Sequence, residues 1–472
     1  MTEADFDFAA RAAKFYAFEQ QHDLFAVEVA GFSAWRVMRN FLFTAYQGYS
    51  PRVGNVPTGQ RLVLALRALV ALFLVLLVGR RRQVLFKGAA SALRFRIDGK
   101  WADPGIDPLI ETGISTLKLV ELNSAGFAPR AVGALHRGAM ESSIFSLLGR
   151  ILGRLRPADD KGFCTRTAKL LSDELGLRVS PAALNMRVST VMWQARLYAL
   201  LIRRIRPDAV IASDTGDYAL RRACQLQAVP FIEIQHGIFD HLHPDAVPDT
   251  AAGTPASLLI PDLLAVKGSY WAGRLQGFRQ GEVAVPVGSH AIDHWRSFRS
   301  SMDGAAGARH IVVTSQGLAI AEMIAWLQQA VAEAPATLGW RMTVKLHPMY
   351  DRRQDFDVLA TMGERVRILT GQEDPGIYEL LATADLHLSI TSACHFDAAA
   401  MGVRSAMMPL QNHESLMYAV DDGVIRLVER PGDLWQLLTD GSAKPDEEEF
   451  CISSYVERMA AVLQQKSGLN HV

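Results

Sequence analysis

Several features that would indicate a common enzyme class or compartment are missing from this sequence. The chain has only four cysteines, Cys164, Cys224, Cys394 and Cys451, and they lie far apart. Their spacing offers neither the close pairs of a structural zinc site nor the density of a disulfide scaffold, so a reducing cytoplasm is expected. Lys plus Arg and Asp plus Glu each number 49, so the formal net charge is zero and no broad basic surface for nucleic acid is indicated.

Familiar phosphate-binding and nucleophile motifs are missing as well. The sequence contains no Gly-x-Gly-x-x-Gly fingerprint, no Gly-Lys-Ser/Thr phosphate loop and no Gly-x-Ser-x-Gly element. These absences weigh against dehydrogenase, P-loop kinase and α/β-hydrolase interpretations. The first residues, Met1 to Asp7, are acidic and lack an apolar segment after basic residues, so no signal peptide is expected.

What the chain does have is a regular alternation of short apolar runs and helical patterns. At 472 residues it is too long for one ordinary core, and the alternation is typical of parallel sheets covered by helices on both faces. A Gly/Ala/Ser-rich stretch at 300–308 interrupts the pattern, which then restarts, so two Rossmann-like domains facing a cleft are expected. The expected divisions are a helical N-terminal appendage at 1–60, an apolar and basic helix at 61–82, a first Rossmann-like domain at 83–300, a second at 309–445, and a C-terminal helix and tail at 446–472.

The pattern also gives the individual elements. Strands are expected at 83–86, 116–122, 209–213, 231–235, 263–266, 283–287, 310–314, 342–346, 366–369, 386–390, 404–408 and 424–427. Helices are expected at 181–206, 319–334, 354–362, 376–383, 395–401, 431–438 and 447–464.

One segment, 62–78, is apolar enough to suggest a membrane contact. It is interrupted only by Arg67 and is followed by Gly79 and the arginines 80–82. A spanning helix needs roughly 20 apolar residues, and an arginine in mid-segment costs about 2.5 to 3.5 kcal/mol on insertion scales. The pattern therefore disfavours a span. It favours either a helix lying in the membrane interface, with its arginines near anionic headgroups, or a buried helix of the first domain.

A Lys-x-His-Pro motif, Lys345 to Pro348, follows the strand expected at 342–346. Pro348 has no N–H for the strand ladder and biases His347 toward extended dihedral angles, so the strand ends here. We expect the His347 imidazole to point into the crevice beyond the sheet, where it can donate to a phosphate oxygen, with Lys345 adding charge from the same face. A solvent-exposed turn histidine is the structural alternative.

A second motif, Ser389 to Asp397, follows the strand expected at 386–390. Thr391 and Ser392 precede a helix whose free N–H groups would form an anion site, although both hydroxyls are also ordinary helix caps. Asp397 either reaches a ribose hydroxyl or simply sits in the first helical turn. The two motifs are expected at neighbouring strand ends of one parallel sheet, so that their side chains converge on a single phosphate.

In the first domain, two strand ends carry candidate acid–base groups. The strand expected at 209–213 ends at Asp214, and the strand expected at 231–235 ends at His236 and Gly237. Asp214 and His236 are therefore candidates for acid–base catalysis, with a helix-cap role as the alternative for Asp214. Gly237 would permit close approach of the backbone to a ligand.

Other polar residues near these strand ends are further candidates. His241 and Ser315 are candidate contacts for the acceptor or the donor. The group His236, Asp240, His241 and His243 is rich in metal-binding residue types, but its spacing matches no strong zinc pattern, so no metal ion is expected.

At these residues the chain resembles a group of bacterial surface-polysaccharide transferases with the GT-B fold. The group includes capsule Kdo transferases, polysialyltransferases and CDP-glycerol glycerophosphotransferases. The likeness rests on the Lys-x-His-Pro motif, on the stretch from Thr391 to Asp397 with the Ala-Met-Gly that follows it, and on Gln235-His236-Gly237, and it covers about residues 209–409. It is moderately specific for the superfamily and weakly specific for any one sugar.

In those families the His-Pro histidine and the Ser/Thr pair hold the phosphate of a cytidine nucleotide, which implies that role for His347, Thr391 and Ser392. Asp397 stands where Kdo transferases have Glu, and the closer parallel for its Phe-Asp pair lies in the glycerophosphotransferases. That departure leaves the donor open.

The resemblance implies a metal- and cofactor-independent glycosyltransferase at the cytoplasmic face of the inner membrane, attached peripherally. The donor would be CMP-Kdo or another CMP-ulosonate, bound by the second domain, and the acceptor a lipid-linked or other glycan bound by the first. Asp214 would act as base or as nucleophile, assisted by His236. Alternatives in the same class are a CDP-glycerol- or CDP-ribitol-type polyol-phosphate transferase and a transferase using a UDP- or GDP-sugar. A non-catalytic nucleotide- or glycan-binding scaffold is the alternative from another class.

Overall fold

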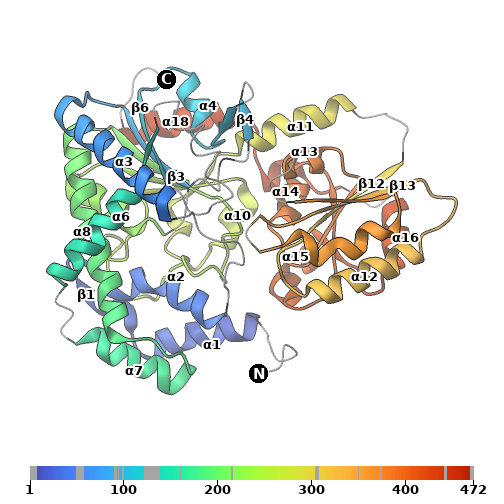
Figure 1. The fold of residues 1–472 in the computed structure, drawn as a ribbon, viewed down its shortest axis with the longest axis horizontal. Helices are drawn as coiled ribbons and strands as arrows, with labels where there is room; N and C mark the ends of the chain where they lie inside the picture. The colour runs from blue at the N-terminus through green and yellow to red at the C-terminus, as the bar shows by residue number, and fades with distance from the viewer. Residues whose placement is uncertain are drawn as a thin grey trace.

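The computed structural model describes residues 8–48, 58–89, 93, 95–97, 100–121, 139–158, 162–213, 216–302, 308–348, 350–370, 375–440 and 444–467. It contains two large sheets, one in each lobe of the molecule, and every strand pairing within them is parallel (Figure 1). The prediction of an α/β protein with two Rossmann-like domains is therefore confirmed. We call the left lobe of Figure 1 the N-terminal domain and the right lobe the C-terminal domain.

The N-terminal sheet has the spatial order β11-β10-β9-β8-β3-β6-β7. From its central strand β3 the chain adds β6 and β7 on one side and then returns to place β8 on the other side of β3. The order therefore reverses between β3 and β8. The strands are β3 (Val84–Ala89), β6 (Thr116–Glu121), β7 (Ala139–Glu141), β8 (Ala209–Ala212), β9 (Phe231–Ile234), β10 (Leu263–Val266) and β11 (Ala284–Pro286).

Both faces of this sheet are buried, as the alternation of its apolar side chains requires. Val84 and Phe86 belong to a core with α4 (Asp107–Glu111) and α18 (Tyr455–Ser467). Leu85, between them, belongs to a second core on the other face of the sheet, which four helices cover. Those helices are α6 (Ser143–Leu155), α7 (Phe163–Leu175), α8 (Pro181–Ile205) and α9 (Tyr218–Gln227).

The N-terminal segment shares that second core. It consists of α1 (Phe8–Gln21), the hairpin β1 (Glu28–Val29) and β2 (Phe32–Ser33), and α2 (Ala34–Tyr46). Two buried ion pairs fix it: Arg36 to Asp245 at 2.6 Å and Arg39 to Glu19 at 2.7 Å. The partners of each pair satisfy each other in a dry environment, so removing one partner would leave a buried charge.

The C-terminal sheet has the spatial order β14-β13-β12-β15-β16-β17. Its strands are β12 (Arg309–Thr314), β13 (Trp340–Lys345), β14 (Val366–Leu369), β15 (Leu386–Ser389), β16 (Arg404–Met407) and β17 (Ile425–Leu427). Its helices are α12 (Ile320–Ala332), α13 (Ile377–Ala382), α14 (Cys394–Ala400), α15 (Met417–Asp421) and α16 (Asp433–Thr439). The helix expected at 354–362 is a 3₁₀ helix, Arg353–Met362.

The prediction that the two C-terminal motifs follow neighbouring strands is wrong. β12 lies between β13, which ends at Lys345, and β15, which ends at Ser389. The chain builds outward from β12 to β14 and then crosses back to the other side of β12. Because adjacent strands are about 4.8 Å apart, the ends of β13 and β15 are separated by roughly twice that distance.

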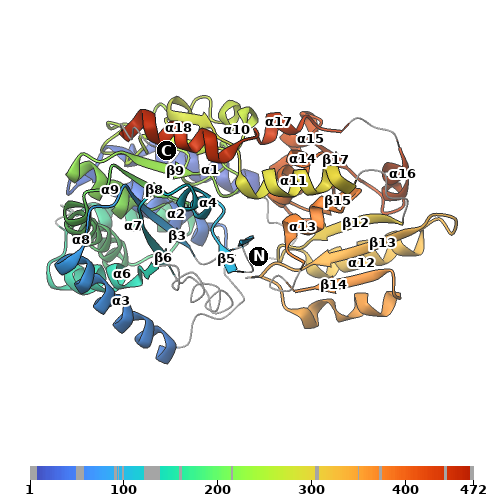
Figure 2. The ribbon, with the colours of Figure 1, turned by 90° about the horizontal axis from the view of Figure 1, so that it is seen from above.

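The chain crosses between the domains twice. Helix α11 (His290–Met302) leads into the C-terminal domain, and α17 (Glu447–Phe450) and α18 lead back onto the N-terminal sheet (Figure 2). The Tyr455 hydroxyl donates to the Gly105 carbonyl at 2.6 Å and anchors α18 there. One helix was predicted at 447–464; the structure has two, separated by Ser454 with a φ of 69°.

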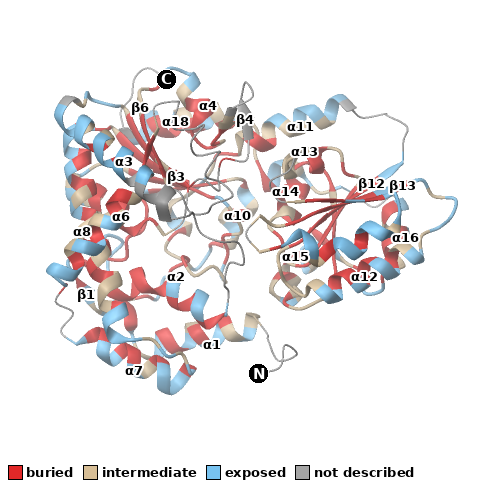
Figure 3. Cartoon of the chain, in the orientation of Figure 1, coloured by how far each residue is buried: buried red, intermediate tan, exposed pale blue. Residues whose placement is uncertain are grey.

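The apolar helix α3 (Thr58–Val78) lies beside α6 and α8 on the outside of the N-terminal domain (Figure 3). It buries Ala68 and Leu72, while the larger apolar side chains around them are exposed. The exposed ones are Val63, Leu66, Leu69, Val70, Phe73, Leu74, Leu76 and Leu77. The buried-helix alternative is therefore wrong for the described side chains of this helix. Within the described residues, no helix is both long enough and apolar enough to cross a membrane.

Candidate functional site

The C-terminal sheet reverses its strand order between β12 and β15. In open parallel sheets, ligands bind in the crevice beyond the carboxyl ends of the strands at such a reversal. Ser315 and Gln316 follow β12, and Thr391 and Ser392 follow β15 after one intervening residue. The candidate site is therefore built around these two strand ends.

Gln316 and Thr391 are clamped together across this reversal point. The Gln316 Oε1 atom accepts from the Thr391 backbone N–H at 3.1 Å and from its hydroxyl at 2.8 Å, while Gln316 Nε2 donates to the Thr391 carbonyl at 3.1 Å. One amide oxygen thus occupies both donors that a phosphate oxygen would use. Thr391 can serve a phosphate only when the Gln316 side chain gives up these bonds.

Ser392 is buried just before α14. Its Oγ accepts from the Cys394 backbone N–H at 3.2 Å, and its carbonyl accepts from the His395 N–H at 3.1 Å. The hydroxyl therefore closes a local turn that leads into the helix, whereas the N-cap residue of α14 is Ala393. Its O–H proton can still be donated to another acceptor.

A cavity of about 200 Å³ lies between the domains at this point. The C-terminal domain contributes Gln316, Thr391 and Asn412, and the loop after β9 contributes Asp240 and His243. The remaining lining residues are Phe8, Ile238, Leu242, Pro244, Ser415 and Leu416. The cavity therefore combines a largely apolar wall with a few polar side chains from both domains, which is typical of small-molecule sites.

Asn412 is a cavity-lining residue whose side-chain amide has no hydrogen-bond partner among the described residues. It is 3% exposed, and within the described structure neither its Oδ1 nor its Nδ2 has a hydrogen-bond partner. An unsatisfied buried polar group costs about 1 to 3 kcal/mol. Its φ of 72° lies in the left-handed region, which Asn tolerates better than most residues. The buried Ser315 Oγ likewise has no partner among the described residues.

His243 is held neutral in the cavity wall. Burial lowers its pKa to about 3. Its Nδ1 accepts from the Asp245 backbone N–H at 3.1 Å, so the ring proton of the neutral form must sit on Nε2. His243 is therefore a neutral hydrogen-bond donor, and the sequence offered it only as part of a metal group.

The Lys-x-His-Pro residues lie beside β13 and β14. The His347 ring stacks on Tyr350 with 4.5 Å between centroids, and the backbone N–H of His347 donates to Asp351 Oδ2 at 2.5 Å. Lys345 is buried, and its Nζ donates to the Pro375 carbonyl at 3.1 Å. The described residues that line the 200 Å³ cavity do not include His347 or Lys345.

Asp397 joins the two domains. Its Oδ1 accepts from Lys267 Nζ, which follows β10 in the N-terminal domain, at 2.6 Å. Burial by itself would lower the pKa of Lys267, but the Asp397 carboxylate raises it above its usual value. In this structure the Asp397 carboxylate therefore links the two domains. The sequence offered Asp397 either as a ribose ligand or as a residue of the first helical turn, and it lies in the first turn of α14.

The candidate residues of the first domain are only partly described, and the described ones are not gathered in one site. Asp214 lies outside the described residues. His236 and His241 are exposed, and the His241 ring lies 5.8 Å from that of Tyr418 across the domain boundary. A Cβ on Gly237 would meet no described atom within 4 Å, so the glycine borders open space. The described residues include no group of three or more His, Cys, Asp or Glu side chains that could hold a metal ion.

Sequence reasoning missed Gln316 and Asn412. Gln316 had a usable signal, because it directly follows a strand whose position was predicted, next to the candidate Ser315. Asn412 had none, because it lies in a turn after β16 and is brought to the cavity only by the tertiary fold.

No protein-family model and no curated protein sequence matches the chain. Among solved structures, the chain is similar to the UDP-GlcNAc 2-epimerase from Neisseria meningitidis bound to UDP-GlcNAc, with 12% identity, a TM-score of 0.47, and 81% of this chain and 99% of that chain covered. It is also similar to MurG from Acinetobacter baumannii, with 12% identity, a TM-score of 0.44, and coverage of 82% and 100%. A third is the glycotransferase of kitacinnamycin, with 12% identity, a TM-score of 0.45, and coverage of 82% and 95%. The fold stated above rests on the sheet topology of this chain and not on these likenesses.

Proposed function

We propose that the protein is a glycosyltransferase that moves a sugar from a nucleotide-activated donor to a glycan or lipid-linked acceptor. The observation that carries the proposal is the interdomain cavity, in which the unpartnered Asn412 amide lies with Thr391 at the strand-order reversal of the C-terminal sheet. Such a cavity suits a polar ligand that both domains must contact at once.

The cavity is smaller than the 300 to 1,000 Å³ typical of ligand pockets, so we infer that it takes the phosphate end of the donor. Thr391 would donate to the phosphate after Gln316 moves away, and neutral His243 would donate from Nε2. Preorganised donors of this kind stabilise the charge that develops on a leaving phosphate. Asp214 remains our proposed base or nucleophile, and His236 its assistant.

For the nucleotide we propose cytidine, in CMP-Kdo or another CMP-ulosonate, on the motif resemblance. His347 and Lys345 follow or end β13, on the far side of β12 from Thr391, and we propose that they contact a part of the nucleotide more remote than the phosphate held at Thr391. We further propose that α3 attaches the protein peripherally to the inner membrane, since the helix exposes an apolar face with Arg67 on it and the exposed arginines 80–82 follow it.

The test is to incubate the purified protein separately with CMP-Kdo, CMP-sialic acid, CDP-glycerol and UDP-sugars and to identify the nucleotide released. Release of CMP from a CMP-ulosonate is expected. Release of UDP alone would overturn the cytidine assignment, and CDP-glycerol turnover alone would make the protein a polyol-phosphate transferase. If the protein neither turned over nor bound any of these donors, the proposal as a whole would be overturned.

A pair of threonine variants ties that activity to the cavity. Thr391→Val removes one hydroxyl while keeping the side-chain shape, and turnover should fall by about 10²- to 10³-fold, the usual loss for one such donor. Thr361→Val is the matched control, because Thr361 is exposed and its hydroxyl donates only to the nearby Val358 carbonyl. Equal activity of the two variants would remove Thr391 from the site.

A further inference from the structure

The N-terminal sheet also reverses its strand order, and a second cavity opens there. This cavity of about 500 Å³ lies at the carboxyl ends of the central strands, where Lys87 belongs to β3, Glu121 ends β6, and Asp217 follows β8. Its volume falls in the range of ordinary ligand pockets. Like the interdomain cavity, it lies at a strand-order reversal, but its chemistry differs.

The cavity is strongly cationic. Lys87 pairs with Asp217 at 2.7 Å and with Glu121 at 2.9 Å, so the two carboxylates are already bound. Three arginines, Arg150, Arg154 and Arg187, line the same space. Among the described residues that line the cavity, four cationic side chains against two carboxylates leave an excess of two positive charges.

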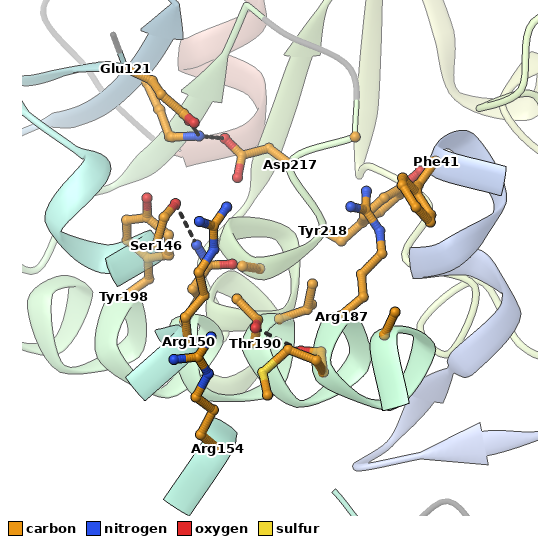
Figure 4. A pocket seen from close by; sticks show the side chains of 17 residues that line it. Phe41, Glu121, Ser146, Arg150, Arg154, Arg187, Thr190, Tyr198, Asp217 and Tyr218 are labelled. Atoms are coloured by element: carbon orange, nitrogen blue, oxygen red, sulfur yellow. Dashed lines mark hydrogen bonds and ion pairs between the residues drawn. The ribbon is translucent and has the colours of Figure 1, made fainter. Parts of the chain in front are cut away.

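These guanidinium groups have few partners among the residues that the structure describes. In the described structure, neither Arg150 nor Arg154 forms an ion pair or a side-chain hydrogen bond, and Figure 4 shows their side chains reaching from α6 into the cavity. Arg187 extends from α8, donates to the Val37 carbonyl at 2.8 Å and lies over the Phe41 ring. Burial lowers the pKa of Arg187. A bound anion would compensate the cost of holding these charges together.

The spacing of residues on α6 adds an apolar neighbour to this charge. Ser146, Arg150 and Arg154 recur every four residues and face the cavity. The residues that follow each of them, Leu147, Ile151 and Leu155, form the adjacent stripe and are 47%, 46% and 72% exposed. Helix α3 packs beside α6 and extends this stripe with its own exposed apolar face. The cationic cavity thus lies next to exposed apolar side chains of α6, and α3 packs beside that helix.

We propose that this cavity binds the phosphate or diphosphate group of an amphiphile whose apolar chain lies along α6 and α3. The excess of two positive charges matches a phosphate or diphosphate ester, and planar guanidinium groups bind phosphate oxygens in pairs. The inference rests on the proposed function, because it identifies the class of the acceptor as an anionic, lipid-linked glycan. The acceptor phosphate then sits in one domain and the donor phosphate in the other.

The test is calorimetric titration of the full chain with farnesyl diphosphate, inorganic pyrophosphate and farnesol. Farnesyl diphosphate should bind at least tenfold more tightly than either of the others, because only it offers both the anion and the apolar chain. In the double variant Arg150→Gln/Arg154→Gln, affinity should fall by about 10- to 100-fold, as expected when a charge-assisted hydrogen bond is lost. Arg178→Gln, an exposed arginine outside the cavity, is the matched control and should bind as the wild type does.

Each contrary outcome overturns a stated part of the inference. Equal affinity for pyrophosphate and farnesyl diphosphate would show a site for free phosphates and overturn the amphiphile. Binding that does not depend on Arg150 and Arg154 would overturn the site itself. Donor turnover reports on the other cavity, so intact turnover with no diphosphate binding would overturn this inference alone.

Discussion

Single side chains decide whether the interdomain cavity is a ligand site or a structural void. Thr391 presents two donors to Gln316, and the Asn412 amide is buried without a hydrogen-bond partner among the described residues. The first arrangement is satisfied without ligand, whereas the second is not. Asn412 is therefore the more informative residue, because nothing described in the protein explains the burial of its amide.

Replacing Asn412 by glycine separates the two interpretations. A φ of 72° suits glycine, and the change removes two unpartnered buried atoms, so thermal melting should shift by no more than a few degrees. Binding of the donor nucleotide, measured by calorimetry, should weaken at least tenfold. A variant that melts much lower but binds nucleotide normally would make Asn412 a structural turn residue.

A site residue could be predicted from the sequence when a local element places it, and not when distant parts of the chain do. Thr391 and Ser392 follow a strand whose position is visible in the sequence, and Thr391 indeed lines the cavity. The Ser392 hydroxyl accepts from the nearby Cys394 backbone N–H. The sequence could not show whether this hydroxyl would make such a local bond or bind a ligand. Asn412 reaches the cavity through long-range packing, and no local pattern encodes that.

The strands and helices themselves were largely predictable, because apolar periodicity is local. The strands expected at 263–266 and 366–369 match β10 and β14 residue for residue, and the long helix expected at 181–206 matches α8 within one residue. The order of strands was not predictable from the same pattern. It depends on which edge of the sheet each crossover returns to, and that choice separated His347 from Thr391 by an intervening strand.

Helix α3 carries a prediction of its own. Leu66 and Phe73 are 56% and 60% exposed, so Leu66→Ser/Phe73→Ser should leave thermal melting nearly unchanged. Full burial of such a side chain is worth about 1.5 to 3 kcal/mol, so binding of the variant to phosphatidylglycerol vesicles should fall at least tenfold in a co-sedimentation assay. Val358→Ser, which changes an exposed side chain of the C-terminal domain, is the control. Vesicle binding that survives the double change would exclude α3 as the attachment surface.

The two domains form one body held by buried contacts as well as by the two chain crossings. Trp271 of the N-terminal domain packs on Phe396 of the C-terminal domain with 4.7 Å between ring centroids. The Tyr418 hydroxyl donates to Asp240 at 2.7 Å, and the Lys267–Asp397 ion pair adds a second polar link between the domains. The walls of the interdomain cavity are thereby fixed relative to each other, and Gln316 is the side chain that must move to admit a phosphate.

Buried histidines should make the whole molecule sensitive to acid. Burial lowers the pKa of His243 to about 3 and those of His310 and His395 to about 4, and it lowers the pKa of His387 as well. His387 and His395 share the Ser405 hydroxyl, at 2.8 and 2.6 Å, and neither has a carboxylate partner among the described residues. Protonating either ring inside the fold would therefore leave an unpaired buried charge.

The sign of the pH effect follows from these directions. In the unfolded chain a histidine takes up a proton near pH 6.5. In the folded protein His310 and His395 stay neutral until about pH 4 and His243 until about pH 3, and the pKa of His387 is lowered as well. The unfolded state therefore binds more protons between about pH 6.5 and pH 4. Stability should fall as pH drops below 6.5, by about 1.4 kcal/mol per pH unit for each such histidine. Asp103 partly offsets this loss of stability at low pH, because burial raises its pKa to about 6 and the folded state then gains a proton.

The melting temperature, measured by circular dichroism, should therefore fall by at least about 5 °C between pH 7.5 and pH 5. In His395→Gln, the melting temperature should depend less steeply on pH. A melting temperature that is constant or rises toward pH 5 would contradict the neutral burial of these rings.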